Sequence, residues 1–393
     1  MGSVGQRAKR ALMICGDYME DYEAMVPFQV LQAVGVRVDA VSPNKKTGQK
    51  CVTAVHEYMG YEIYTELEGH FFTLNASFSD ANLEDYDALI IPGGRFTEVI
   101  CVDDDVVNMV TRFAGLGRPI LTTCHSQLVL VSAGLISGKR CTAFPSLKHV
   151  VKLAGGAWVE PDPVTTAVAD GNVITAIGWP AHNEILSQLL GSMGARITGA
   201  HGKSVLFVCG DYTEDYEINV VFRAFGGLGC RVDAISPGKS AGEKCVTCIQ
   251  DFGIKGSEIC SEQKVGHYFI ITNDVERMKV ADYDCIVIPG GRAPEYLAVD
   301  ERVVSLVKQF SEENKIVSAI GEGQLVLAAA GLLKGKKCAS SGGMRVVVGL
   351  AGGEADETSE SVAHGKMVTA KGWNSLPNFI SDLASVLGIT VTF

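Results

Sequence analysis

Hydrophobic residues along this chain gather in short, uninterrupted runs separated by longer amphipathic segments. Three runs predict buried strands at Ala11–Cys15, Val36–Val41 and Ala88–Ile91. Between them, apolar residues recur at helical spacing over Tyr22–Val34 and Asp105–Ala114. Strands that alternate with helices are typical of βαβ units, in which helices cover both faces of a parallel sheet. We therefore expect a three-layer α/β sandwich.

The whole pattern occurs twice. The repeat distance is nearly constant at roughly 195 residues, which suits a duplicated domain rather than a solenoid unit. The matching segments are Met13–Glu23 with Phe207–Glu217, Val36–Pro43 with Cys230–Pro237, and Tyr86–Arg95 with Tyr283–Arg292. The sequence predicts two similar domains, 7–197 and 202–393. Because the glycine-rich connection between them is short, we expect an intrachain pseudo-dimer on which a homo-oligomer is built.

Composition and charge exclude several classes of protein. At 393 residues and 47% hydrophobic content, the chain can bury two cores, so it is not disordered. Its net charge of -11, without a local basic stripe, argues against nucleic-acid binding. No apolar run reaches the roughly 20 residues that span a bilayer. The basic N-terminus lacks the apolar core of a secretory leader, so we expect a cytoplasmic protein, with the nucleus as an alternative.

Twelve cysteines are scattered through the chain, and several recur in both halves. A chain of this size needs no disulfide staples, so we interpret them as buried reduced thiols. Cys245 and Cys248 have the spacing of metal ligands, but no second pair follows at a useful distance. We expect neither a metal nor a cofactor.

One pair of residues differs between the halves in a way that points to chemistry. Cys124 and His125 follow an apolar strand and precede a helix, whereas Gly321 and Glu322 stand at the same place in the second half. A cysteine at a helix start lies near the positive end of the helix dipole, which favours the thiolate. A buried structural thiol is the alternative for Cys124. The difference between the halves favours one competent site and one retired site.

Three further features are candidates for the same site. Glu23 follows the first strand and could move a proton, although it persists as Glu217 and acids are favoured at any helix start. His125 could act as a base toward a substrate, or serve the helix start. Gly93 and Gly94 could present backbone N–H groups to an oxyanion or substrate, or serve only as a turn.

These motifs resemble the ThiJ/PfpI superfamily, the DJ-one family, and specifically its tandem-domain plant members. The resemblance rests on Gly16–Glu23, Ile91–Arg95 and Cys124–Gln127 with their second-half counterparts, and covers both halves almost end to end. It implies two tandem flavodoxin-like domains with mainly parallel sheets, and a nucleophile-elbow cysteine at Cys124 with Glu23 and His125 beside it.

The resemblance also implies an activity, the glutathione-independent conversion of small α-oxoaldehydes such as methylglyoxal and glyoxal to hydroxy acids. The thiol would act in the first domain only, on a small aldehyde substrate. Two residues depart from the family pattern. Thr123 precedes the cysteine, and Ser126 follows the histidine at a position where glycine is common. The alternative function is a non-catalytic protein of the oxidative-stress response, in which Cys124 is a redox sensor.

Overall fold

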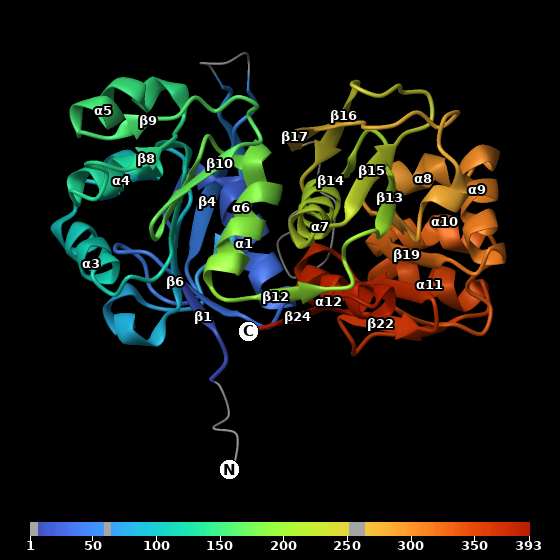
Figure 1. The fold of residues 1–393 in the computed structure, drawn as a ribbon. Coiled ribbons are helices and arrows are strands. Elements are labelled where there is room, and N and C mark those ends of the chain that lie inside the picture. The colour runs from blue at the N-terminus through green and yellow to red at the C-terminus, as the bar shows by residue number, and fades with distance from the viewer. Residues whose placement is uncertain (1–6, 59–63, 251–263) are drawn as a thin grey trace, which may run out of the picture. The chain divides into compact units, whose positions relative to one another are not determined.

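The structure is a computed structural model that describes residues 7–58, 64–250 and 264–393. The chain divides into two compact units, Met1–Arg196 with Thr392–Phe393, and Ile197–Val391. Each unit has a mainly parallel sheet with helices on both faces (Figure 1). The predicted fold class, two repeated α/β sandwich domains, is confirmed.

The first unit is built on a six-stranded sheet. Its strands, in spatial order, are β10 (Ala167–Asp170), β11 (Val173–Ala176), β7 (Ile120–Thr123), β6 (Ala88–Ile91), β1 (Arg10–Ile14) and β3 (Arg37–Val41). All neighbours are parallel except β10 and β11. The central strands are buried on both faces, which explains why they are continuous apolar runs rather than alternating ones.

Helices cover the two faces of this sheet (Figure 1). One face carries α1 (Asp21–Ala33) and α6 (His182–Ser192); the other carries α2 (Phe96–Ile100), α3 (Asp104–Ala114) and α4 (Gln127–Ser132), with α5 (Lys148–Leu153) beyond them. The amphipathic helix α3 buries Val106, Met109, Val110 and Phe113. Its start is capped by the Asp103 carboxylate, which accepts hydrogen bonds from two backbone N–H groups.

Smaller strands complete the unit. The sheet β2 (Met19–Glu20), β4 (Lys50–Val55) and β5 (Leu67–Thr73) lies beside α1, and β8 (Arg140–Cys141) pairs with β9 (Ala157–Trp158). The 3-10 turns are η1 (Phe78–Asp80), η2 (Leu83–Asp85), η3 (Cys124–Ser126), η4 (Pro145–Leu147) and η5 (Trp179–Ala181).

The second unit repeats this architecture. Its main sheet runs β15 (Arg231–Ile235), β13 (Ser204–Val208), β18 (Cys285–Ile288), β19 (Ile316–Ile320), β23 (Met367–Ala370) and β22 (Ser361–His364). Its helices are α7 (Asp215–Leu228), α8 (Ala293–Leu297), α9 (Glu301–Glu312), α10 (Gln324–Ala329), α11 (Gly342–Leu350) and α12 (Leu376–Leu387). The smaller strands are β14 (Thr213–Glu214), β16 (Lys244–Cys248), β17 (Val265–Ile270), β20 (Lys337–Ala339) and β21 (Glu354–Asp356), and the 3-10 turns are η6 (Val280–Asp282), η7 (Gly321–Gly323) and η8 (Trp373–Ser375). The chain also forms β12 (Arg196–Thr198) and β24 (Thr390–Thr392).

Two expectations from composition can be compared with this fold. Over the described ranges, no helix has both the length and the apolar character required to cross a membrane. Every cysteine in those ranges is a free thiol, and most are buried, as expected for reduced core cysteines. The first six residues of the N-terminal segment lie outside the described residues.

The order of the strands decides where a ligand can bind. The chain passes from β1 to β3 on one side and then returns to β6 on the other side of β1. Ligands in open α/β sheets bind beyond the carboxyl ends of the strands at such a reversal. The segments that follow β1, β6 and β7 contain Glu23, the Gly93–Gly94 turn and Cys124, respectively.

We predict that Phe113→Ala lowers the free energy of unfolding of the first domain by about 3 to 5 kcal/mol, because it empties a fully buried site under α3. Urea denaturation of the full chain, followed by circular dichroism, measures the change. Thr111→Ala, at an exposed position of the same helix, is the matched control. An equal effect of the two substitutions would contradict the assignment of Phe113 to the core.

Candidate active site

Cys124 lies at a sharp turn between β7 and α4. Its φ angle is +54°, an uncommon conformation for a residue with a side chain, and Gly321 takes the same conformation in the second domain at +49°. The turn is held locally, because the Ser126 hydroxyl accepts a hydrogen bond from the Thr123 N–H and donates one to the Thr123 carbonyl, both at 2.7 Å. A strained, closely fixed backbone at a candidate nucleophile is typical of functional turns.

This geometry explains Ser126, one of the two residues that depart from the family pattern. The Ser126 hydroxyl is used within its own turn and is fully buried, so it does not project toward a substrate. Its counterpart Gly323 has no room for a side chain, since a Cβ there would lie 2.1 Å from the Ile288 carbonyl oxygen. The two domains therefore brace the same turn differently.

Glu23 lies at the start of α1 with its carboxyl group buried in the protein. Its Oε2 accepts a hydrogen bond of 2.6 Å from the Gly93 N–H and one of 2.5 Å from the Thr123 hydroxyl. Burial, with a smaller contribution from the Glu20 carboxylate, raises the pKa of Glu23 to about 8, and hydrogen bonds from Thr123, Gly93 and the Trp179 backbone offset only part of that rise. Glu23 is therefore mostly protonated at neutral pH and can donate its proton.

Thr123, the second residue that departs from the family pattern, is part of the candidate site. The sequence identified this residue as a departure from the family pattern without assigning it a partner. Its hydroxyl instead connects the elbow to the candidate acid. The second domain has Ile320 at this position, which cannot form such a bond.

His125 points toward the neighbouring thiol, although its place in the sequence did not require this. Its Nδ1 is 3.2 Å from Cys124 Sγ, and its Nε2 is 3.3 Å from the Ser146 hydroxyl. The imidazole ring stacks on Phe144 with a centroid distance of 5.3 Å and an interplanar angle of 24°. Burial lowers the pKa of His125 to about 4, so the ring is neutral at pH 7 and can accept a proton from sulfur.

An aromatic enclosure surrounds the thiol. Cys124 forms a buried cluster with Phe144 and Ile177, and Tyr58 and Tyr64 pack against it. Burial raises the pKa of Tyr64 to about 12 and that of Tyr58 well above its ordinary value, so both phenols remain neutral hydrogen-bond donors. Sequence reasoning missed these residues and Ser146. Comparison of the two halves holds a signal for two of them, because Ser341 and Gly343 replace Phe144 and Ser146.

The charge state of Cys124 differs from the sequence expectation. Burial raises the pKa of the thiol well above its ordinary value, and the Glu23 and Glu20 carboxylates add to the effect. Backbone N–H groups of His125 and Gly94 face the sulfur and lower the pKa, but they do not outweigh burial. The resting group is a thiol beside a neutral imidazole, and the thiolate that the helix dipole predicts is disfavoured.

The glycine turn also differs in part from its predicted role. The Gly93 N–H is committed to Glu23, so it is not available to an oxyanion in this arrangement. The Gly94 N–H faces the sulfur and, together with that of His125, is the available donor pair. Gly93 has a second function, since a Cβ there would lie 2.4 Å from the Cys124 Cβ and 2.5 Å from Glu23 Oε2. Only glycine allows the acid and the thiol to approach this closely.

The equivalent place in the second domain keeps the acid and loses the thiol. Glu217 Oε2 accepts a hydrogen bond of 2.6 Å from the Gly290 N–H, as Glu23 does from Gly93. The Gly291 N–H, equivalent to the Gly94 N–H that faces the sulfur, donates to Glu322 Oε2 at 3.2 Å. A fixed carboxylate therefore uses this donor in the second domain.

Comparison with known proteins agrees with the two repeated domains. The sequence model of the DJ-1/PfpI family matches residues 9–192 and 203–385. The chain belongs to the DJ-1/PfpI family. Among its relatives in this family, DJ-1 protein homolog E of Arabidopsis thaliana is 48% identical and covers 98% of both chains. Deglycase PfpI of Pyrococcus furiosus is 26% identical and covers 42% of this chain and 89% of its own. The crystal structure of Drosophila melanogaster DJ-1beta aligns with 48% of this chain and 92% of its own, with a TM-score of 0.39 and 23% identity.

We predict a pH dependence of stability that originates at Glu23. Its folded pKa of about 8 exceeds the ordinary 4.5, so the folded state holds a proton that the unfolded chain releases. The stabilisation is complete below pH 4.5 and is lost as the pH rises to about 8, with an upper limit of about 5 kcal/mol. Urea denaturation at several pH values should show a smaller decrease for Glu23→Gln than for the unchanged protein. Asp104→Asn, at an exposed carboxylate, should retain the full decrease.

We also predict that alkylation of Cys124 by iodoacetamide accelerates continuously up to about pH 9 without a plateau, because only the thiolate reacts. Mass spectrometry of the peptide that contains Cys124 measures the rate at each pH, with free glutathione as the reference thiol. A rate that levels off below pH 7 would show a preformed thiolate and contradict the effect of burial described above.

Proposed function

We propose that the first domain converts small α-oxoaldehydes to hydroxy acids without glutathione, through covalent catalysis by Cys124. The observation that carries the proposal is the arrangement around the thiol: a neutral imidazole at 3.2 Å, two backbone N–H groups that lower the pKa of the thiol, and a protonated carboxyl group linked to the same turn. Such a set can deprotonate a nucleophile, stabilise an oxyanion and donate a proton.

The first step is attack of Cys124 Sγ on the aldehyde carbon. The S–H proton passes to His125 Nδ1 as the C–S bond forms, which avoids a free thiolate in an apolar site. The Ser146 hydroxyl can orient the ring by its contact with Nε2. The aldehyde oxygen gains the electron pair of the carbonyl bond and then takes the proton, which yields a hemithioacetal.

The second step moves hydrogen between the two carbon atoms. Neutral His125 removes the proton from the former aldehyde carbon to give an enediol and then returns a proton to the neighbouring carbon. Protonated Glu23 can donate to the developing enediol oxygen, because its raised pKa makes it an acid near neutral pH. The product of this step is a thioester, and a water molecule hydrolyses it to the hydroxy acid and the free thiol. The sum is one aldehyde and one water converted to one acid.

The second domain takes no part in this chemistry in our proposal. Gly321 supplies no nucleophile, and the Glu322 carboxylate accepts a hydrogen bond from Gly291. Negative charge at that position would repel a developing oxyanion. The role of Glu217 in the second domain is then to tie α7 to the glycine turn through Gly290.

The Pyrococcus furiosus relative is named a deglycase, which suggests a related substrate. An adduct of an α-oxoaldehyde with an amine or thiol presents the same two carbon atoms to the nucleophile. The redox-sensor alternative is less well supported, because a buried thiol with a raised pKa oxidises slowly.

We predict that the purified protein forms lactate from methylglyoxal without glutathione, and that Cys124→Ser abolishes the activity. His125→Ala and Glu23→Gln should each lower kcat/KM by about a hundredfold or more, since each removes a proton-transfer group. Enzymatic determination of lactate measures the rates.

Controls separate the proposed site from other thiols. Cys101→Ser, at a partly exposed cysteine of the same domain, should leave the rate unchanged. Lactate formation that survives in Cys124→Ser would exclude Cys124 as the nucleophile. Absence of turnover in the unchanged protein, with normal folding by circular dichroism, would favour the sensor alternative.

A further inference from the structure

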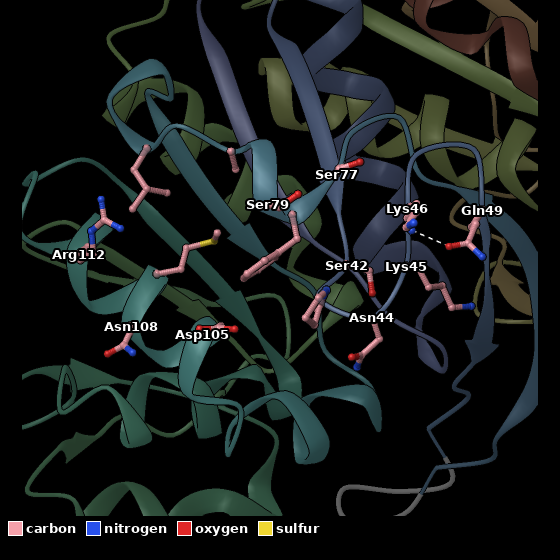
Figure 2. A pocket seen from close by; sticks show the side chains of 15 residues that line it. Ser42, Asn44, Lys45, Lys46, Gln49, Ser77, Ser79, Asp105, Asn108 and Arg112 are labelled. Atoms are coloured by element: carbon pink, nitrogen blue, oxygen red, sulfur yellow. Dashed lines mark hydrogen bonds between the residues drawn. The ribbon is translucent and has the colours of Figure 1, made fainter.

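A hollow of about 940 Å³ opens in the first domain between the loop that follows β3, the segment that precedes β6, and one face of α3 (Figure 2). The second domain has a hollow of about 250 Å³ at the equivalent place, beside α9. None of the residues assigned to the candidate active site lines the hollow of the first domain. Groups that contact an aldehyde bound to Cys124 must therefore come from the enclosure around the thiol.

Tyr58 belongs to this enclosure and is held by its neighbours. Its ring packs against those of Phe144 and Trp179, with centroid distances of 5.8 and 5.7 Å. The Trp179 indole is itself fixed, because its Nε1–H donates to the His56 carbonyl oxygen at 2.9 Å. These contacts determine where the Tyr58 hydroxyl lies.

The Tyr58 hydroxyl and the candidate acid approach the same point beside Gly178. A Cβ at Gly178 would lie 2.4 Å from Tyr58 Oη and 2.7 Å from Glu23 Oε1. A side chain at this position would displace one of the two oxygen atoms. Glycine therefore allows a phenol and a carboxyl group to converge next to the backbone.

Both oxygen atoms can donate a hydrogen bond to a ligand. Glu23 Oε2 accepts hydrogen bonds from Gly93 and Thr123, so the proton of the neutral acid belongs on Oε1. Among the described residues, the acceptor for the Tyr58 hydroxyl is the Ile177 carbonyl oxygen at 3.5 Å, a distance at which a hydrogen bond is weak. A substrate oxygen can replace that contact.

This pair of donors lies close to the thiol. Tyr58 packs against the cluster that contains Cys124. After burial, the charges of Cys124 and Glu23 make the largest contributions to the raised pKa of Tyr58, as expected for a hydroxyl group near both. A substrate attached to the sulfur therefore meets donors at two places, the backbone N–H groups that face the sulfur and the Tyr58–Glu23 pair.

The second domain lacks the hydroxyl group as well as the thiol. Lys50–Val55 matches Lys244–Ile249 without a gap, which places Phe252 opposite Tyr58 in the repeat. The alignment holds in the structure up to Gln250, whose carbonyl oxygen accepts a hydrogen bond from Trp373 Nε1 at 2.8 Å, as that of His56 does from Trp179. Phe252 itself lies outside the described residues, but its identity shows that the second copy carries a ring without a donor.

On the basis of the function proposed for Cys124, we propose that Tyr58 and Glu23 form a second oxyanion site, which binds the carbonyl oxygen adjacent to the attacked aldehyde. When His125 removes the proton from the former aldehyde carbon, the electron pair moves to this oxygen. Tyr58 donates a hydrogen bond to it, and Glu23 transfers its proton. The hydroxyl proton that is released when the thioester carbonyl group forms restores the acid.

This second oxyanion site has two consequences. A tyrosine hydroxyl beside a protonated carboxyl group is a known donor pair for an enolate oxygen, so Tyr58 is a catalytic residue of the enediol step. Because the pair binds a second oxygen, the site selects molecules with two adjacent carbonyl groups over simple aldehydes.

Tyr58→Phe tests the catalytic role, since it removes the hydroxyl group and keeps the ring. We expect kcat for lactate formation from methylglyoxal to fall about tenfold or more, because one donor to the enediol oxygen is lost. Alkylation of Cys124 by iodoacetamide should keep its rate, because the thiol keeps its base and its backbone N–H neighbours. Tyr86→Phe removes a buried hydroxyl group that is bound to Asp39 at 3.0 Å, away from the elbow, and should leave lactate formation unchanged.

Protection of Cys124 tests the second oxyanion site without turnover. Methylglyoxal and propanal each have three carbon atoms and an aldehyde, but only methylglyoxal has the adjacent carbonyl group. Each forms a hemithioacetal that shields the thiol from iodoacetamide, and mass spectrometry of the peptide that contains Cys124 measures the shielding. We expect the preference for methylglyoxal over propanal to exceed that of free glutathione about tenfold, from two added hydrogen bonds. Tyr58→Phe should lose much of this excess.

Three results would overturn the proposal. Folded Tyr58→Phe forms lactate as fast as the unchanged protein; the substitution weakens protection by propanal as much as protection by methylglyoxal; or the unchanged protein shows no greater preference than glutathione. The last measurement requires no variant, so it decides the question if Tyr58→Phe does not fold. Absence of lactate formation together with the excess preference would instead refute the function proposed for Cys124 and retain the second oxyanion site as a binding site.

Discussion

The buried carboxyl group of Glu23 is the interaction on which the site of the first domain depends. It binds two segments that lie 70 and 100 residues from it in the chain, through the Gly93 N–H and the Thr123 hydroxyl. A charged carboxylate would be costly in this enclosure, so burial raises its pKa and keeps the proton in place. The same bonds hold the acid beside the thiol. In the proposed mechanism, structural and chemical roles therefore coincide in a single side chain.

The second domain separates these two roles. Its Glu217 keeps the hydrogen bond to the glycine turn, so the architecture of the turn survives without the nucleophile. The side chains that define the chemistry of the first site are each replaced: Thr123, Cys124, His125, Phe144 and Ser146 correspond to Ile320, Gly321, Glu322, Ser341 and Gly343. The whole set differs, rather than the cysteine alone, which supports our proposal that these residues act together in the first domain.

The cavities beneath α3 and α9 follow the same logic at a second place. The duplicated backbone creates a hollow in both domains, and a few side chains decide its size and charge. Arg112 corresponds to Gln309, whereas Asp105 corresponds to Arg302, so the lining charges differ in both directions. The backbone is shared, and the side chains set the size and lining of each hollow.

The sequence by itself determined the fold class, the duplication and the place of the elbow, because each follows from local periodicity or from direct comparison of the halves. The run Ala88–Ile91 is a strand over those same residues, and Tyr22–Val34 corresponds to α1 within one residue at each end. Only the tertiary structure decided the charge states and the partners. The thiol is neutral and Gly93 serves the acid, since burial and through-space hydrogen bonds set both, and neither has a local signal. Thr123, Ser146 and the aromatic enclosure became part of the site for the same reason: residues distant in sequence meet only when the sheet has formed.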